Sequence, residues 1–339
     1  MRSKYFEECV HKVRDAVSRG ELLEAFRGFE EELCDGAIKG LDLGQFADCD
    51  DWITWLKWAS ISLDENDYLK AALYGLSLAQ KLAATDYGTS RQRDLGQLWT
   101  DTIRGFLGEI AFMKWLRERF GVIVELDYER GPIAEFLPSD IRSVNGREPR
   151  LRVSIKTTKL GGIWLDIPGA QIKHSDVFVL VRAGITREHF IAFLKKISVI
   201  GEKFVKEALN RGLLREEELR EIWNAVPEFE SIPACIAGFL DKSEYADELK
   251  NEYSVIDVDG KVGRKRVVIN KYLGFWHPEK LEYKVVVRDL LKKKGKNVTS
   301  DMEIEFEGIG NFSRTLHFIA SSGILKKKKE HWERLLYKL

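Results

Sequence analysis

Three ionisable residues stand in an order that suits phosphodiester hydrolysis: Glu109 in RGFLGEIAF, Asp140 in PSDI and Lys156 in VSIKTTK. This reaction needs a divalent metal that activates water and neutralises charge on the transition state. Mg²⁺ prefers oxygen ligands and keeps several waters, so one or two carboxylates suffice to hold it. A lysine beside the metal can orient the attacking water, help to deprotonate it and stabilise developing charge. We therefore expect these three residues to form one site.

The elements that must position them follow from the periodicity of the chain. Apolar residues at helical spacing predict a long helix over about 94–120, with Gly121 at the position where a helix-ending glycine belongs. Short β-branched or alternating runs then predict strands over 122–126, 136–144, 151–158, 163–167 and 176–183. Alternation in LRVSIKTT places Ser154, Lys156 and Thr158 on one strand face. A helix beside this sheet would direct Glu109 to the same pocket.

This order of residues and elements resembles the PD-(D/E)xK nuclease superfamily, which has the restriction-endonuclease-like fold. GEIAF resembles the helix glutamate context, P-S-D the P-D element with Ser139 inserted, and S-I-K-T-T the (D/E)-x-K strand. Gln171 followed by SDVFVLV resembles the return from helix to strand in many members. The resemblance covers roughly residues 95–183.

The resemblance implies an α/β (α+β) fold, with a central mixed sheet flanked by helices, a helical N-terminal region and a mixed C-terminal region. It also implies Mg²⁺ as the cofactor, with Mn²⁺ as an alternative. Residue by residue, the implied site consists of Glu109 and Asp140 as metal-holding acids, the main-chain carbonyl of Ile155 as a further metal ligand, and Lys156 as the catalytic lysine.

Ser154 departs from the family pattern, because it stands where the second acid of the (D/E)-x-K strand belongs. A hydroxyl is a much poorer Mg²⁺ ligand than a carboxylate. Three interpretations remain open. Glu109 and Asp140 hold the metal without a further acid, or a nearby acid such as Asp166 replaces it, or the site is degenerate and the fold only binds DNA.

Charge is unevenly distributed along a chain whose formal net charge is +0. Residues 1–95 carry 12 basic against 18 acidic side chains, whereas residues 260–296 carry 12 basic against three acidic ones. This asymmetry suggests a polyanion partner, and Lys or Arg contacts to phosphate supply salt-sensitive affinity. The KKKK run at 326–329 has the composition of a solvated helix end. The expected DNA contacts are Lys159, Lys173, Arg264, Lys265, Arg266, Lys292, Lys293 and Lys294.

The organisation that we expect has four parts. Residues 1–92 form a helical N-terminal region and residues 93–185 a nuclease-like core. Residues 186–252 form a helical insertion or linker, since the chain returns to helix over 187–250, and residues 253–339 form a basic, mixed α/β region that binds DNA. Cysteines 9, 34, 49 and 235 lack zinc-ligand spacing, which favours free thiols in a reducing cytoplasm.

These observations predict a cytoplasmic endonuclease that acts on double-stranded DNA, most specifically a type II restriction enzyme that works as a homodimer. The chain has no P-loop, GxSxG or HExxH motif and no apolar run that could span a membrane. Two alternatives stay close to this function: a repair or recombination nuclease, and a catalytically degenerate DNA-binding protein on the same fold. A third is an interaction protein whose N-terminal helices dock a partner.

Overall fold

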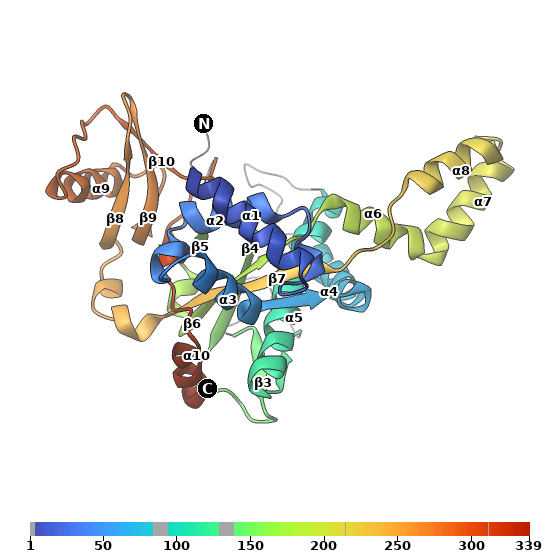
Figure 1. The fold of residues 1–339 in the computed structure, drawn as a ribbon, viewed down its shortest axis with the longest axis horizontal. Coiled ribbons are helices and arrows are strands. Elements are labelled where there is room, and N and C mark those ends of the chain that lie inside the picture. Colours follow the sequence, from blue (N-terminus) through green and yellow to red (C-terminus); the bar gives the residue numbers. More distant parts are fainter. Residues whose placement is uncertain (1–3, 84–93, 129–138, 214, 311) are drawn as a thin grey trace.

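The computed structural model describes residues 4–83, 94–128, 139–213, 215–310 and 312–339, and its architecture is mixed α/β (Figure 1). The central sheet has four strands in the order β1-β7-β6-β4. β4 runs parallel to β6, and the other two pairs are antiparallel. A mixed central sheet is therefore present, as the sequence predicted. The bounds are β1 Ser60–Leu63, β4 Val153–Lys159, β6 Val177–Ala183 and β7 Ile232–Asp241.

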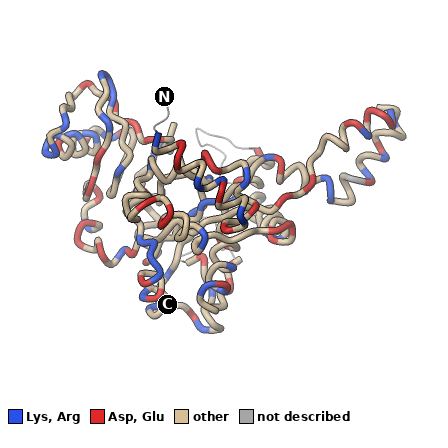
Figure 2. The backbone as a smooth tube through the Cα atoms, in the orientation of Figure 1, with Lys and Arg blue, Asp and Glu red and all other residues tan. Residues whose placement is uncertain are grey.

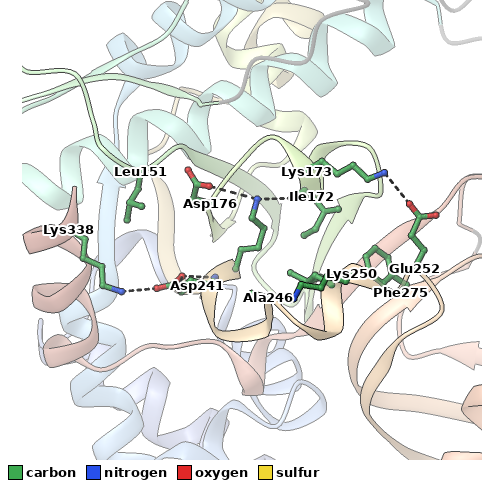
Figure 3. Close-up of a pocket in the computed structure, with 13 residues that line it drawn as sticks. Leu151, Ile172, Lys173, Asp176, Asp241, Ala246, Lys250, Glu252, Phe275 and Lys338 are labelled. Atoms are coloured by element: carbon green, nitrogen blue, oxygen red, sulfur yellow. Dashed lines mark hydrogen bonds and ion pairs between the residues drawn. The ribbon is translucent and has the colours of Figure 1, made fainter.

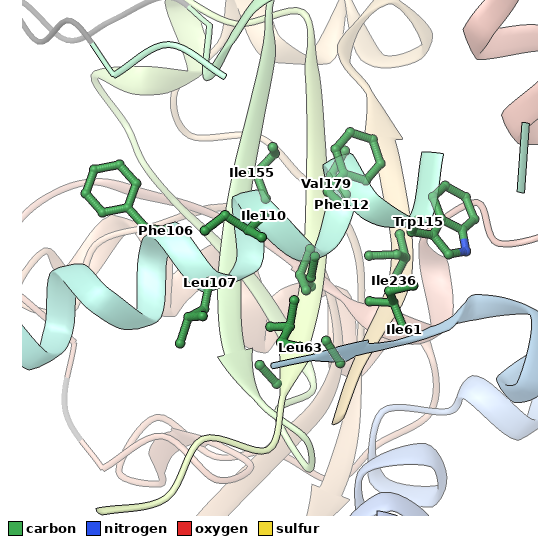
Figure 4. Packing of buried hydrophobic residues seen from close by; sticks show 14 of the residues in the cluster. Ile61, Leu63, Phe106, Leu107, Ile110, Phe112, Trp115, Ile155, Val179 and Ile236 are labelled. Carbon is green, nitrogen blue, oxygen red and sulfur yellow. The ribbon is translucent and has the colours of Figure 1, made fainter. Parts of the chain in front are cut away.

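One long helix, α5 (Leu95–Phe120), covers a face of this sheet. It begins after Asp94, whose carboxylate accepts a hydrogen bond from the Gln97 amide at 2.7 Å, and it ends at Gly121 with φ 65°. Its apolar stripe contacts a residue from each strand: Ile61, Ile155, Val179 and Ile236 (Figure 4). The predicted helix is confirmed. α4 (Glu65–Ala83) packs on its outer side.

A second sheet lies beside the first, and the two share a hydrophobic cluster that includes Phe178 and Leu180 of β6 and Ala237 and Leu240 of β7. Its order is β10-β9-β11-β5, and β8 pairs with β9. Because β5 follows β4 in the chain yet belongs to this sheet, residues 160–163 carry the chain from one sheet to the other. The bounds are β5 Trp164–Pro168, β8 Val255–Val262, β9 Arg266–Trp276, β10 Glu303–Phe306, β11 His317–Ser321 and, packed against β8, α9 Leu281–Lys293. β2 (Val124–Leu126) and β3 (Ile141–Val144) form a separate antiparallel ribbon.

The predicted return to helix over 187–250 is wrong for residues 232–241, which form the buried strand β7 between β1 and β6. IPACIAGFL is a continuous apolar run, and a strand covered on both faces lacks the alternation that identifies a strand. Of the helices that precede β7, α6 (Arg187–Lys196) packs on the body through buried Phe193. The helices after it project as an arm (Figure 1) and are η4 Val199–Phe204, α7 Val205–Asn210 and α8 Glu216–Ala225.

The N-terminal helices form a third hydrophobic cluster, which includes Leu160 and Cys235 of the central region. All four cysteines are buried, free thiols, which confirms that part of the prediction. No described helix is long and apolar enough to cross a membrane. The remaining elements are α1 Lys4–Ser18, η1 Glu24–Phe26, α2 Glu30–Lys39, η2 Asp42–Gln45, α3 Cys49–Ala59, η3 Gln171–Lys173, η5 Lys242–Tyr245, η6 Glu248–Lys250, η7 Ser322–Ile324 and α10 Lys329–Lys338.

A buried ionic cluster joins these parts. Asp42 and Lys327 have 0% of their side-chain surface exposed, and Arg182 has 3%. The Asp42 carboxylate lies 2.7 Å from the Arg182 guanidinium and 2.9 Å from the Lys327 ammonium. Arg182 also donates to the Ser322 hydroxyl at 2.8 Å. The cluster thus connects η2, β6 and the segment that follows β11.

Removing the acid from this cluster should destabilise the protein strongly. Asp42→Ala leaves two buried cations without their counter-charge, and we expect it to lower the free energy of unfolding by about 3–5 kcal/mol. Urea denaturation measures the change. Glu24→Ala is the control, because it removes an exposed ion pair with Arg27 and should leave the unfolding midpoint in place. Equal midpoints for the two variants would contradict the role given to the cluster.

Candidate active site

The outer edge of β4 carries the first half of the candidate site. Val153 accepts a hydrogen bond from the Asp140 amide at 2.7 Å and donates one to the Ser139 hydroxyl at 3.2 Å, so both its backbone groups point to this edge. Two residues on, the Ile155 amide donates to the Asp140 carboxylate at 2.6 Å. The Ile155 carbonyl must point the same way, because the N–H and C=O of one strand residue share an edge. A carboxylate and a carbonyl therefore lie together at one edge.

Lys156 and Ser154 lie on the face of β4 that turns away from α5. Val153 and Ile155 pack into the hydrophobic cluster under α5, and alternation directs the residues between and after them to the opposite face. There the Lys156 ammonium donates to the Gln171 side-chain oxygen at 2.6 Å. Ser154 is buried, with 6% of its surface exposed. Gln171 was not among the predicted site residues, although the segment that contains it resembled the nuclease pattern.

Glu109 reaches β4 from the α5 side. α5 and β4 approach closely at Gly108, where an added Cβ would lie 1.8 Å from the Thr157 hydroxyl oxygen. Only glycine permits this contact, and the next residue is Glu109, with 5% of its surface exposed. Burial and the negative charge of Glu109 raise the pKa of Tyr128, which identifies Tyr128 as a neighbour of that carboxylate. Nothing in the sequence indicated this tyrosine.

The structure thus places the predicted residues in two separate contacts rather than in a single cluster. Asp140 contacts Ile155, and Lys156 contacts Gln171. Glu109 lies on the face of β4 that α5 covers, whereas the Lys156 side chain lies on the opposite face of the same strand. Asp140 lies at the strand edge between the two faces. Among the described residues, no three His, Cys, Asp or Glu side chains form a metal-binding group. A sparse set of one or two carboxylates, a carbonyl and water is nonetheless what Mg²⁺ commonly uses, so the edge at Asp140 and Ile155 fits this ion.

Asp166, the alternative acid, is engaged elsewhere. It lies on β5 in the second sheet, where its Oδ1 is 2.8 Å from Nδ1 of the buried His317. His317 Nε2 lies 2.9 Å from the Ser313 hydroxyl. Burial lowers the pKa of His317, but the hydrogen bond and charge of Asp166 and the Ser313 carbonyl outweigh it, so the pKa is raised overall.

The predicted DNA contacts divide between two regions. Lys159 is exposed at the end of β4, and Lys173 on η3 forms an ion pair with Glu252 at 3.2 Å. The other six lie in the second-sheet region, around the β8–β9 turn and the end of α9 (Figure 2). Two of these are paired with acids, Arg266 with Glu305 and Lys294 with Asp257. The exposed ones without an ion pair in the described chain are Arg264, Lys265, Lys292 and Lys293.

Comparisons of the chain with protein-family models, with curated proteins and with solved structures find no match. The assignment of the candidate site therefore rests on the contacts within it. These are the Asp140 bond to the β4 backbone, the Lys156 bond to Gln171, and the packing of Gly108 on Thr157.

The close approach of α5 to β4 gives a matched pair of variants within one helix. Gly108→Ala places a methyl group against Thr157, and we expect the overpacking to destabilise the protein by about 1–3 kcal/mol. Gly105→Ala meets nothing within 4 Å and should stabilise the helix by about 0.5–1 kcal/mol. Chemical denaturation of both variants measures these changes. If Gly108→Ala were as stable as Gly105→Ala, the close contact would be wrong.

The His317–Asp166 pair predicts the sign of a pH dependence. The folded-state pKa of His317 is raised, so the stabilisation is complete below the unfolded value of about 6.5 and is lost as pH rises through the folded value. Asp166→Asn removes the charge that causes this. The stability difference between wild type and Asp166→Asn should therefore be larger at about pH 5.5 than at about pH 8.5. A difference that does not vary with pH would contradict the pairing.

Proposed function

We propose that this protein is a metal-dependent endodeoxyribonuclease that hydrolyses phosphodiester bonds of duplex DNA on a restriction-endonuclease-like core. The observation that supports this most directly is the short hydrogen bond from the Ile155 amide to the Asp140 carboxylate, one residue before Lys156. It brings the acid of P-S-D to the middle residue of S-I-K. That is the relation which the resemblance to the PD-(D/E)xK superfamily implies.

Asp140 and the Ile155 carbonyl would hold Mg²⁺ or, as an alternative, Mn²⁺, with Glu109 as the further acid. The metal, when bound, supplies activation of water and neutralisation of charge on the scissile phosphate. The hydrogen bond from the Ile155 amide to one Asp140 oxygen fixes the orientation of the carboxylate. The other oxygen would then be held in place to bind the metal.

Lys156 would orient the attacking water and stabilise the developing negative charge. Gln171 supports this role because its side-chain oxygen accepts a hydrogen bond from the Lys156 ammonium at 2.6 Å and so restricts the position of that group. The single turn η3 and the strand β4 therefore both contribute to the placement of Lys156.

Duplex DNA would be held by the exposed cations at the β8–β9 turn and the end of α9, together with Lys159 near the site. Each Lys or Arg that contacts a phosphate releases a condensed counterion and adds salt-sensitive affinity. Arg264, Lys265, Lys292 and Lys293 support this role because their charges are not consumed by ion pairs within the described chain. The two clusters lie on adjoining elements of one region (Figure 2).

A type II restriction endonuclease acting in the cytoplasm as a homodimer is the specific form of this proposal. Cutting both antiparallel strands suits a twofold pair of sites, one for each strand. The elements outside the nuclease-like core would then supply sequence recognition and dimer contacts. A repair or recombination nuclease would use the same site chemistry with less sequence selection.

A second candidate, a catalytically degenerate DNA-binding protein, is favoured by one observation. Ser154 is buried, and its hydroxyl stands in the place of the family's second acid. A loss of that carboxylate would leave the DNA-binding surface intact while weakening the metal site.

Cleavage of supercoiled plasmid with and without Mg²⁺ tests the proposal. Lys156→Ala and Asp140→Asn should each lower the cleavage rate by at least about 100-fold. Asp140→Asn keeps an oxygen acceptor for the Ile155 amide, so the strand edge should stay folded. Lys206→Ala, an exposed lysine on α7, is the matched control and should cleave at the wild-type rate.

Two results would redirect the interpretation. Cleavage by Lys156→Ala at the wild-type rate, in folded protein, would exclude the catalytic assignment. Inert wild-type protein that binds duplex DNA in a salt-dependent manner, and that gains Mg²⁺-dependent cleavage with Ser154→Glu, would establish the degenerate alternative.

A further inference from the structure

A cavity of about 440 Å³ lies where the ends of β6 and β7 meet the second sheet. Its volume falls in the range of small-molecule binding sites, about 300–1,000 Å³. Leu151, Ile172, Leu249 and Phe275 supply apolar wall, and charged side chains surround it (Figure 3). An apolar cavity with a few converging polar groups is the usual form of a site for a small organic ligand.

Most charges around this cavity are balanced one to one. Lys173 pairs with Glu252 at 3.2 Å and Lys338 with Asp241 at 3.2 Å. Lys250, also at the cavity, pairs with Asp247 at 2.6 Å. These three pairs contribute no net charge to the cavity.

The remaining acid, Asp176, is shared between two cations. Arg152 donates to both of its carboxylate oxygens, each at 3.0 Å, and its backbone amide adds a third bond at 2.9 Å. The Lys242 ammonium is farther away, at 3.8 Å, and donates to the Ile172 carbonyl at 3.2 Å. One carboxylate thus faces two cations, which leaves a positive charge at Lys242. Burial lowers the pKa of Lys242 although the charge of Asp176 opposes this, as expected of an incompletely compensated ammonium.

We infer that this cavity binds a small organic anion, whose apolar body lies against Ile172, Leu249 and Phe275 and whose anionic group pairs with Lys242. The inference stands on the cavity volume, its apolar wall and the excess cation. A single negative charge matches the single uncompensated positive one. A dianion or a cation would leave a charge without a partner in a partly desolvated site.

The cavity is separate from the candidate active site but shares one element with it. In η3, Gln171 contacts Lys156, whereas the next two residues, Ile172 and Lys173, line the cavity. A bound anion would therefore lie one residue from the group that positions Lys156. Binding can be measured without any nuclease activity, so this inference and the proposed function fail or succeed independently.

Anilinonaphthalene sulfonate is a suitable probe, because it is an apolar monoanion that fluoresces when it leaves water. We expect saturable binding to the folded wild-type protein. Lys242→Met keeps the aliphatic stem and removes the charge-assisted contact, so Kd should rise at least about tenfold. Lys206→Met is the matched control: it removes an exposed lysine on α7 that does not line the cavity, and Kd should stay within about twofold.

Two further measurements separate this cavity from other apolar surface. Ala246→Trp fills the cavity while Lys242 is intact, and it should abolish saturable binding. Phenylnaphthylamine has the same rings without the sulfonate, and it should bind the wild type more weakly and be indifferent to Lys242→Met. Near-ultraviolet circular dichroism confirms that each variant is folded. Wild-type binding weaker than about 1 mM, or equal Kd values for wild type, Lys242→Met and Ala246→Trp, would overturn the inference.

Discussion

The arrangement of the whole molecule depends on the buried cluster of Asp42, Arg182 and Lys327. Desolvation opposes an ionised Asp42, but the charges of Arg182 and Lys327 outweigh it, so the pKa of Asp42 is lowered and the acid stays charged. Each ion is costly to bury alone, so the three segments that carry them are stable only together. Because Arg182 belongs to β6, the cluster fixes the strand against which β4 is paired, and thereby the position of the candidate site.

β4 is an edge strand, and an open edge presents unpaired backbone groups that invite pairing with another chain. Ser139 and Asp140 meet this constraint, because they bond the outward groups of Val153 and Ile155. The same bonds bring a carboxylate to the strand edge beside Lys156. The same contacts therefore protect the edge and build the candidate site.

Local patterns in the sequence predicted the elements whose periodicity is intact. α5, with its helix-ending Gly121, and the strands β2 to β6 were identified in this way. β7 was missed because burial on both faces removes alternation, and β1 because four residues, SISL, lie between two helices. KKKK at 326–329 has the composition of a solvated helix end, yet Lys327 is fully buried. Its counter-ion, Asp42, lies near the opposite end of the chain, and no local pattern connects the two residues.

In the candidate site, too, the residues that belong to local motifs were predictable, and those brought in by the tertiary fold were not. Asp140 and Lys156 belong to short motifs, and their types indicate their chemistry. Gln171 contacts Lys156 because β5 belongs to the second sheet and the chain then returns through η3 to the central sheet. No local pattern of the sequence indicates this contact. The distribution of charge shows the same limit. Asp257, Asp259 and Glu305 lie just outside the basic span 260–296 and neutralise part of it, as ion pairs with Lys271, Lys294, Lys296 and Arg266. The counted excess therefore overstates the cations that would be available to a polyanion, and the smaller, unpaired group would set the salt dependence of the proposed DNA binding.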